Sequence, residues 1–127
     1  QELLAESPRA PAVNQVEFHP FLYQRELLEF CRTHAIQLEA YSPLVRGRRL
    51  GHPVIRGIAV QRKRTPAQIL IRWSLQHGLV VIPKSVRPER IQENAAVFDF
   101  ELTLDEMKRL DSLDERSHVA WNPDNLP

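Results

Sequence analysis

The sequence is poor in cysteine and contains no long apolar run. Its one cysteine, Cys31, has no partner for an intrachain disulfide, and its neighbours Leu27, Leu28 and Phe30 indicate a thiol packed on a helix face. No stretch approaches the roughly 18 apolar residues that a membrane-spanning helix requires. The segment 1–6 has neither the basic nor the hydrophobic region of a secretory signal. We therefore expect a cytoplasmic protein that does not enter a membrane.

Acidic residues are absent from the segment 46–64, which holds seven basic ones although the net charge of the chain is only +1. A nucleic-acid-binding surface would use such a run to contact phosphates. However, no aromatic side chains alternate with these arginines for base stacking, and the run is interrupted at Gly47, Gly51, Pro53 and Gly57. We interpret it as a solvated loop and helix face, and we expect no nucleic-acid partner.

Three short apolar or alternating runs predict strands at 12–18, 36–42 and 79–83, each followed by a helical pattern. The segment 1–7 resembles the end of a further helix. A repeat of strand and helix is typical of parallel strands joined by crossover helices. Because a complete (β/α)₈ barrel takes about 250 residues, three units supply less than half of one. The sequence therefore predicts an α/β fold in which 1–127 is a single partial barrel domain, with 115–127 as a terminal loop.

Two of the predicted helices carry complete start signals. Thr65 as N-cap, with Gln68 three residues later, forms a capping box, and Thr103 with Glu106 forms a second. Gly78 is a stop signal for the first of these helices. Leu102 is placed to pack on Met107. The apolar residues of the second helix predict a buried stripe of Leu104, Met107, Leu110 and Leu113.

A cluster of polar residues follows the third predicted strand. Ligands bind at the carboxyl ends of parallel strands, where the loops converge. Lys84 and Ser85 lie just before a predicted helix, and Arg90 falls in its first turn. An ammonium, a hydroxyl, free backbone amides and a guanidinium can therefore meet on one anion. The cluster predicts a phosphate site, although a solvated helix start remains an equal alternative for this cluster taken alone.

Four separated segments resemble the C-terminal half of the aldo-keto reductases in order and spacing. They are VNQVEFHP at 13–20, EAYSPL at 39–44, TPAQILIRW at 65–73 and VVIPKSVRPERIQEN at 80–94. The resemblance implies the last three βα units of a (β/α)₈ TIM barrel, followed by a C-terminal helix and tail. It also implies an NADPH-dependent oxidoreductase that reduces small aldehydes and ketones to alcohols.

The resemblance further implies nine cofactor-binding residues. Gln15 matches the contact to the nicotinamide carboxamide, and Tyr41 the one to the nicotinamide ring. Ser42 and Leu44 match contacts to the pyrophosphate. The 2′-phosphate is matched by Lys84, Ser85 and Arg90, and the adenine by Glu93 and Asn94. Two cations and a helix start suit a dianionic 2′-phosphate, which favours NADPH over NADH. The resemblance places the loop with Arg46, Arg48 and Arg49 near the pyrophosphate, where these side chains would add to phosphate attraction.

The catalytic residues of the family have no match in this chain. The resemblance requires a proton-donating tyrosine assisted by a lysine, an aspartate and a histidine, and a Ser-Asn pair that completes the carboxamide clamp. The right residue types occur only at positions with structural or cofactor-binding roles, namely Tyr23, Tyr41, His19, His34 and Lys84. We interpret His19-Pro20 as a packing and turn feature. We expect no catalytic residue, no metal site and negligible turnover from this chain alone.

Two alternatives stay open beside a truncated reductase. One is a non-catalytic nucleotide-binding or assembly half-barrel, which pairs its exposed strand edges with another copy. The other is an unrelated phosphate-binding module with an open sheet. Trp121 lies in the tail that, by resemblance, borders a substrate pocket, although hydrophobic anchoring explains it equally well.

Overall fold

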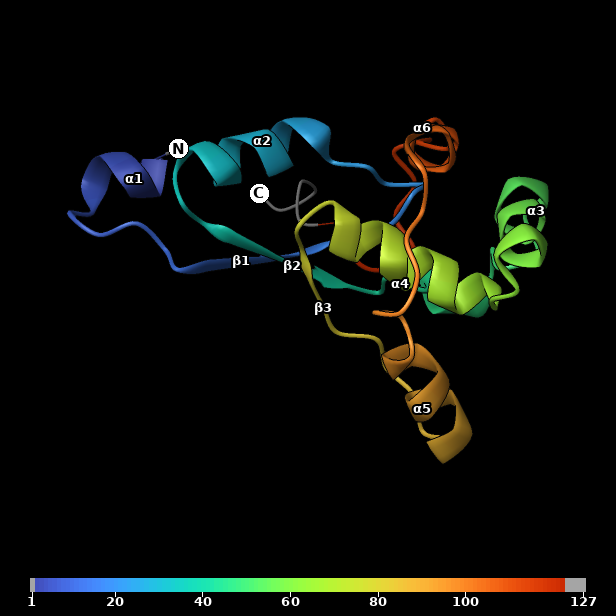
Figure 1. Cartoon of the computed structure of the whole chain (residues 1–127). Helices are drawn as coiled ribbons and strands as arrows, with labels where there is room; N and C mark the ends of the chain where they lie inside the picture. Colours follow the sequence, from blue (N-terminus) through green and yellow to red (C-terminus); the bar gives the residue numbers. More distant parts are fainter. Residues whose placement is uncertain (1, 123–127) are drawn as a thin grey trace.

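An open parallel sheet with helices packed around it forms the structure, a computed structural model that describes residues 2–122 (Figure 1). The sheet order is β1-β2-β3, and both pairings are parallel. In chain order the elements are α1 (Glu2–Glu6), β1 (Val13–Glu17), α2 (Arg25–Thr33), β2 (Gln37–Tyr41), the 3₁₀ turn η1 (Val45–Gly47), α3 (Pro53–Arg62), α4 (Pro66–Gln76), β3 (Val80–Val81), α5 (Pro88–Ala95) and α6 (Leu104–Asp111).

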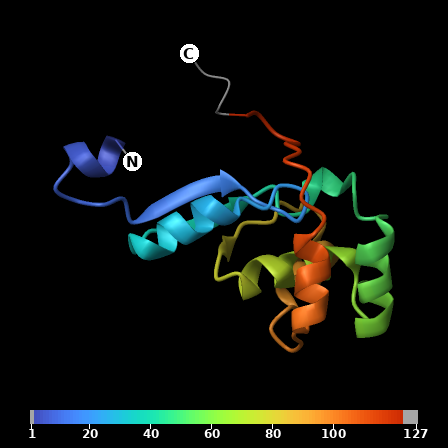
Figure 2. The ribbon, with the colours of Figure 1, turned by 90° about the horizontal axis from the view of Figure 1, so that it is seen from above.

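The three predicted strands are confirmed, and so is their parallel arrangement. In the register of the first pair, Val13 faces Gln37 and Glu17 faces Tyr41, so β1 and β2 end side by side. The third strand is shorter than expected, because only Val80 and Val81 pair with β2. The strand β1 points toward the side of the molecule where α3 and α6 lie (Figure 2). The carboxyl end of β2 leads through η1 toward α3, and the carboxyl end of β3 leads into α5.

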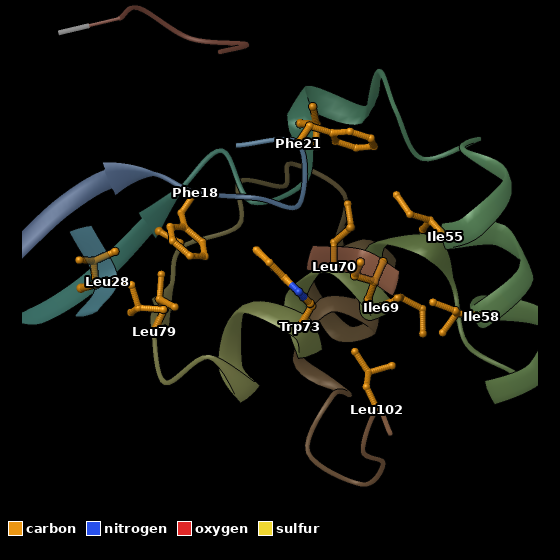
Figure 3. Packing of buried hydrophobic residues seen from close by; sticks show 14 of the residues in the cluster. Phe18, Phe21, Leu28, Ile55, Ile58, Ile69, Leu70, Trp73, Leu79 and Leu102 are labelled. Atoms are coloured by element: carbon orange, nitrogen blue, oxygen red, sulfur yellow. The ribbon is translucent and has the colours of Figure 1, made fainter. Parts of the chain in front are cut away.

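Helix α4 lies at the centre of the core, as its apolar stripe predicts. Ile69, Leu70 and Trp73 are fully buried. The indole of Trp73 stacks on Phe18, which directly follows β1, with a ring separation of 5.3 Å. Leu28 of α2 belongs to the same cluster (Figure 3). Burial of a large apolar side chain contributes about 1.5–3 kcal/mol, so this cluster fixes α4 against the sheet. Cys31 is buried in it, which confirms its predicted packing role.

Both predicted capping boxes are present. The hydroxyls of Thr65 and Thr103 accept from the amides of Gln68 and Glu106, whose side chains bond back to the N-cap amides. Gly78 follows α4 with φ +78°, a left-handed conformation that glycine adopts without strain.

The stripe predicted for α6 is wrong at one position, Leu104. Met107, Leu110 and Leu113 pack in or against the core, whereas the side chain of Leu104 is 82% exposed. The cause is the chain reversal at the cap: Leu102, the residue before it, is 4% exposed and occupies the core at that end of the helix.

The two ends of the described chain contribute little to the core. Helix α1 confirms the helix expected near the start, but it buries no residue, and it lies far from α3 and α6 in both views (Figures 1 and 2). Residues 112–122 carry no helix or strand. The predicted terminal loop 115–127 extends beyond the described residues from position 123 on. Within residues 2–122, no helix has the length and apolar character needed to span a membrane.

Candidate functional site

A hollow of about 1140 Å³ opens beside the carboxyl ends of β2 and β3. Its walls come from three segments: 42–50 after β2, 65–67 at the start of α4, and 82–94, which leads from β3 into α5. Seven of the nine predicted cofactor-binding residues line it, namely Ser42, Leu44, Lys84, Ser85, Arg90, Glu93 and Asn94. The fold thus brings together residues that the sequence keeps in separate segments.

The charge on the walls of the hollow is strongly positive. Four cationic side chains line it, those of Arg46, Lys84, Arg87 and Arg90, against the single carboxylate of Glu93. Arg90 lies in the first turn of α5, where free backbone amides and the helix dipole also favour an anion. The lining therefore suits a ligand that carries more than one negative charge. Lys84 and Arg90 face one common hollow, as the phosphate prediction requires.

Arg87 is a lining residue that the sequence reasoning missed. It is the N-cap residue of α5, without a side-chain cap. Its amide donates to the hydroxyl of Ser85, and that hydroxyl donates to its carbonyl oxygen, both at 3.4 Å. This short turn places Arg87 next to Lys84 and Ser85. Its position between Ser85 and Arg90, inside the predicted cluster, was the available signal.

The rim of the hollow on the β2 side is a backbone under strain. Ser42, Val45 and Arg46 have φ values of 51°, 53° and 51°, in the left-handed region that costs a residue with a side chain about 1–2 kcal/mol. The surroundings hold this conformation: Val45 is fully buried, and its amide donates to the carbonyl of Ser42 at 2.9 Å. The buried Val45 therefore anchors the loop, while the neighbouring Arg46 stays exposed at the rim.

The three arginines expected to attract phosphate divide into different roles. Arg46 lines the hollow, whereas Arg48 is exposed outside its lining. The guanidinium of Arg49 donates to both carboxylate oxygens of Glu115, at 2.8 and 3.2 Å, and lies 4.0 Å from the ring centre of Phe21. Arg49 therefore lies outside the lining, with its charge paired to an intramolecular carboxylate.

The wall formed by α5 is tied to the start of α4. The hydroxyl of Thr65 donates to Oε1 of Glu93 at 2.7 Å. The Nε2 group of Gln68 donates to the carbonyl oxygens of Glu93 and Ala96, at 3.0 and 2.9 Å. Asn94, one residue further on, is buried and lines the hollow. The capping box of α4 thus also fixes the position of α5.

Gln15 and Tyr41 lie outside the lining of the hollow. The exposed amide of Gln15 donates to the carboxylate of Glu39 on the neighbouring strand. Tyr41 ends β2 directly before Ser42, which does line the hollow. Burial and the nearby carboxylate of Glu17 raise the pKa of Tyr41 above its ordinary value, so its phenol stays protonated near neutral pH. Gln15 thus lies in the middle of β1, and Tyr41 at the end of β2, so neither belongs to the walls of the hollow.

Comparison with known proteins assigns this architecture. The family model described as "Aldo/keto reductase family" matches residues 1–115. The chain belongs to the aldo/keto reductase family. This confirms the resemblance of the four segments. The alternative of an unrelated open-sheet phosphate module is wrong.

The relatives of this reductase chain are close in sequence and in structure. It is 50% identical over 126 residues to the uncharacterized oxidoreductase YtbE of Bacillus subtilis (strain 168) and 48% identical to the glyoxal reductase of the same strain, covering 99% of the chain in both cases. A crystal structure of a mutant of Gox0644 in complex with NADPH superposes with a TM-score of 0.92 at 42% identity. An aldo-keto reductase from a Medee basin deep-sea metagenome library gives 0.93 at 38% identity.

The chain spans less than half the length of these relatives. It covers 45% of YtbE, 46% of the glyoxal reductase and 47% of each of the two solved structures. The open three-stranded sheet agrees with such a share of a barrel fold.

A cluster around Glu17 is the second feature of this aldo/keto reductase chain that the sequence did not predict. The carboxylate is 2% exposed. It accepts from Nδ1 of His118 at 3.1 Å, from the amide of Val119 at 2.8 Å and from the amide of Ala120 at 3.2 Å. Nε2 of His19 lies 3.1 Å away on the other side. We call these contacts the tail clasp, because they fasten residues 118–120 to the end of β1.

Ionisation in the tail clasp is set by its hydrogen bonds. Burial alone would raise the pKa of Glu17, but the amide of Val119, His19 and the amide of Ala120 together hold that pKa below its ordinary value. Burial lowers the pKa of His19, against the opposing effect of Glu17, so the imidazole stays neutral. The carbonyl of His19 accepts from the amide of Leu22 at 2.8 Å, which confirms the packing and turn role expected for this residue.

The remaining residues of catalytic type are engaged in packing. Tyr23 packs against Phe18 and Trp73, and burial raises its pKa. His34 stacks on Phe30 with ring centres 4.1 Å apart. Trp121 is 62% exposed. No group of three or more His, Cys, Asp or Glu side chains within residues 2–122 has the arrangement of a metal site.

Proposed function

We propose that this chain is the cofactor-binding part of an NADPH-dependent aldo/keto reductase that reduces aldehydes or ketones to alcohols. The observation that supports the proposal is the hollow with four cationic side chains at the carboxyl ends of the strands. A relative named glyoxal reductase and a related structure in complex with NADPH agree with this chemistry.

The donor set of the hollow fits the phosphate end of NADPH. Lys84, Ser85 and Arg90 are assigned to the 2′-phosphate, which is absent from NADH. A dianionic phosphate at this point would meet an ammonium, a guanidinium and the start of α5. Ser42 and Leu44 are assigned to the pyrophosphate, at the rim that also carries Arg46.

The other end of the cofactor is assigned to the strand ends. Gln15 would hold the nicotinamide carboxamide through its side-chain oxygen, since its Nε2 group donates to Glu39. Tyr41 would stack on the nicotinamide ring and fix the face that it presents. The chemistry supplied by bound NADPH is hydride transfer to a carbonyl carbon.

The proton for the alcohol oxygen is assigned to residues outside this chain. Tyr23, His19 and His34 are buried or stacked in packing roles. We therefore expect negligible reductase turnover from the chain alone, because loss of general acid catalysis costs about 10²- to 10⁴-fold.

An Arg90→Ala substitution tests the assignment. A charge-assisted hydrogen bond is worth about 1.5–3 kcal/mol, so affinity for NADPH should fall about 10- to 100-fold, while affinity for NADH stays unchanged. Arg56→Ala is the matched control, because it removes the same charge from an exposed position on α3 that lies outside the lining. Isothermal titration of both dinucleotides measures the effect. Equal loss for NADPH and NADH, or no loss for either, would contradict the 2′-phosphate assignment.

A second candidate function is self-assembly of a non-catalytic half-barrel. Each of the edge strands β1 and β3 pairs on one side only in the described sheet. Val13, Val80 and Ile82 are between 42% and 50% exposed there. Unpaired, apolar edges favour association with another chain. Sedimentation equilibrium separates the cases, because assembly requires a concentration-dependent dimer that a Val80→Lys substitution weakens.

A further inference from the structure

The tail segment 114–120 lies along the loop that follows β1 and is fastened there by a small set of hydrogen bonds. The amides of Glu115 and Ser117 both donate to the carbonyl oxygen of Phe21, at 3.2 and 3.0 Å. The tail clasp holds the residues that follow. Figure 2 shows this segment, drawn in red, passing the end of β1 and the turn η1. Because the segment carries no helix or strand, its opening depends mainly on these contacts.

An ion pair joins the tail segment to the loop that walls the hollow. The carboxylate of Glu115 accepts two hydrogen bonds from the guanidinium of Arg49, at 2.8 and 3.2 Å. The same guanidinium lies 4.0 Å from the ring centre of Phe21. The ring of His52, at the far end of the loop, packs edge-on against that phenyl ring with centres 5.5 Å apart. Phe21 therefore holds the tail segment through its carbonyl oxygen and the loop through its ring.

The turn that precedes Arg49 contains the cation at the rim of the hollow. The amide of Arg48 donates to the carbonyl oxygen of the buried Val45 at 3.1 Å, and the amide of His52 donates to that of Arg49, also at 3.1 Å. Arg46 lies inside the first of these turns and lines the hollow. An anion that binds Arg46 therefore restrains the same stretch of backbone from which Arg49 reaches the tail segment.

We propose that the ion pair between Arg49 and Glu115 couples the binding of a polyanion in the hollow to closure of the tail segment over the end of β1. An anion held by Arg46 restrains the turn η1 and keeps Arg49 within reach of Glu115, so the tail segment opens less often. Coupling between two sites is reciprocal, so a tail segment that opens more often weakens the binding of the polyanion by the same factor. The inference goes beyond the proposed function, because it requires a polyanion in the hollow but not that this polyanion is NADPH.

Amide hydrogen exchange on the full chain, with and without saturating inorganic pyrophosphate, tests the coupling. The readout is the exchange rate of the amides of Val119 and Ala120, which the tail clasp protects. Because the ion pair is partly exposed, pyrophosphate should slow this exchange by only about two- to fivefold. Sodium chloride at the same ionic strength is the control, since it screens the ion pair and should not slow the exchange. Exchange that pyrophosphate leaves unchanged or accelerates overturns the inference, and so does a failure of pyrophosphate to bind.

Two matched variants separate the coupling from a general effect of the anion. Glu115→Gln removes the charge that holds Arg49, so the effect of pyrophosphate on the exchange rate should shrink to less than about 1.5-fold. Glu101→Gln makes the same chemical change in the exposed partner of Arg72, outside the tail segment and outside the lining of the hollow. This control should keep the full effect. A Glu115→Gln variant that responds to pyrophosphate as strongly as the native protein overturns the inference.

Calorimetric titration with pyrophosphate measures the reciprocal effect. Affinity should fall about two- to fivefold in Glu115→Gln, although Glu115 lies outside the lining, and stay unchanged in Glu101→Gln. Loss of a negative charge by itself would raise the affinity for an anion, so the sign of the change identifies the coupling. An affinity that rises or stays the same in Glu115→Gln overturns the inference. The proposed function is judged separately, since selective loss of NADPH binding in Arg90→Ala does not depend on Glu115.

Discussion

Replacement of Glu17 by glutamine should loosen the tail clasp and measurably destabilise the fold. The substitution keeps the size of the side chain but removes its charge. One oxygen of the amide can still accept from the amide of Val119, whereas the new NH₂ group faces donors at His118 or Ala120. The perturbation therefore converts charge-assisted bonds into neutral ones and creates a donor-to-donor clash.

The magnitude follows from the contacts. A hydrogen bond to a charged group contributes about 1.5–3 kcal/mol, and a neutral one about 0.5–1.5 kcal/mol, so each contact loses about 1 kcal/mol. With four donors on the carboxylate, the gross loss is about 4 kcal/mol. A neutral amide costs less to bury than a carboxylate, which offsets about half of this loss. We expect a net destabilisation of about 2 kcal/mol.

Urea unfolding and amide hydrogen exchange measure the global and the local effect. The urea midpoint should fall in Glu17→Gln, and the amides of Val119 and Ala120 should exchange faster. Glu29→Gln, an exposed position on α2, is the control with the same chemical change and little expected effect. An unchanged midpoint together with unchanged exchange at Val119 and Ala120 would refute the reasoning, because the buried carboxylate would then contribute nothing to holding the tail.

Three further predictions concern other polar contacts of the fold. Gln68→Glu keeps the acceptor of the capping box but loses both hydrogen bonds that the Nε2 group donates to α5, so the free energy of unfolding should fall by about 2–4 kcal/mol in urea titrations. Gln68→Asn should lower the free energy of unfolding by less, because it keeps an amide. The free energy of unfolding should decrease as the pH falls below 6.5, because burial lowers the pKa of His19 and of His77 in the folded state, whereas the unfolded chain takes up these protons at the ordinary value of 6.5. In thermal melts between pH 7 and pH 5, His77→Gln should make the melting temperature depend less on pH. An unaltered pH dependence in this variant would contradict the prediction. Arg62→Ala leaves the buried carboxylate of Glu106 without its bidentate partner, so the free energy of unfolding should fall by about 2–3 kcal/mol in calorimetry. A melting temperature equal to that of the native protein would disprove this prediction.

Elements with complete local signals were predictable from the sequence. The capping boxes at Thr65 and Thr103 and the glycine stop at Gly78 involve residues within a few positions of one another, so the sequence contains the whole interaction. The error at Leu104 shows the limit of this reasoning. Helical periodicity places it on the apolar face, but which residue fills the core at the end of α6 depends on the path of the chain before the cap, where Leu102 is buried.

Contacts between distant residues had no local signal. Glu17 and Val119 are 102 positions apart, and Arg49 and Glu115 are 66 apart. Neither pair belongs to a motif, because each residue is a common type in an ordinary setting. The predicted phosphate cluster is local by contrast: Lys84, Ser85 and Arg90 lie in one segment at a helix start, so local geometry alone places them along the same hollow.

The two ends of the candidate cofactor site therefore depend on the fold in different ways. The phosphate end is built mainly from one continuous segment, 82–94, and it is braced from α4 through Thr65 and Gln68. The proposed nicotinamide end depends on Gln15 in the middle of β1 and on Tyr41 at the end of β2. If the proposed function holds, the adenosine and phosphate portion of the cofactor should supply most of the affinity, because the hollow assigned to it is lined mainly by the braced segment 82–94.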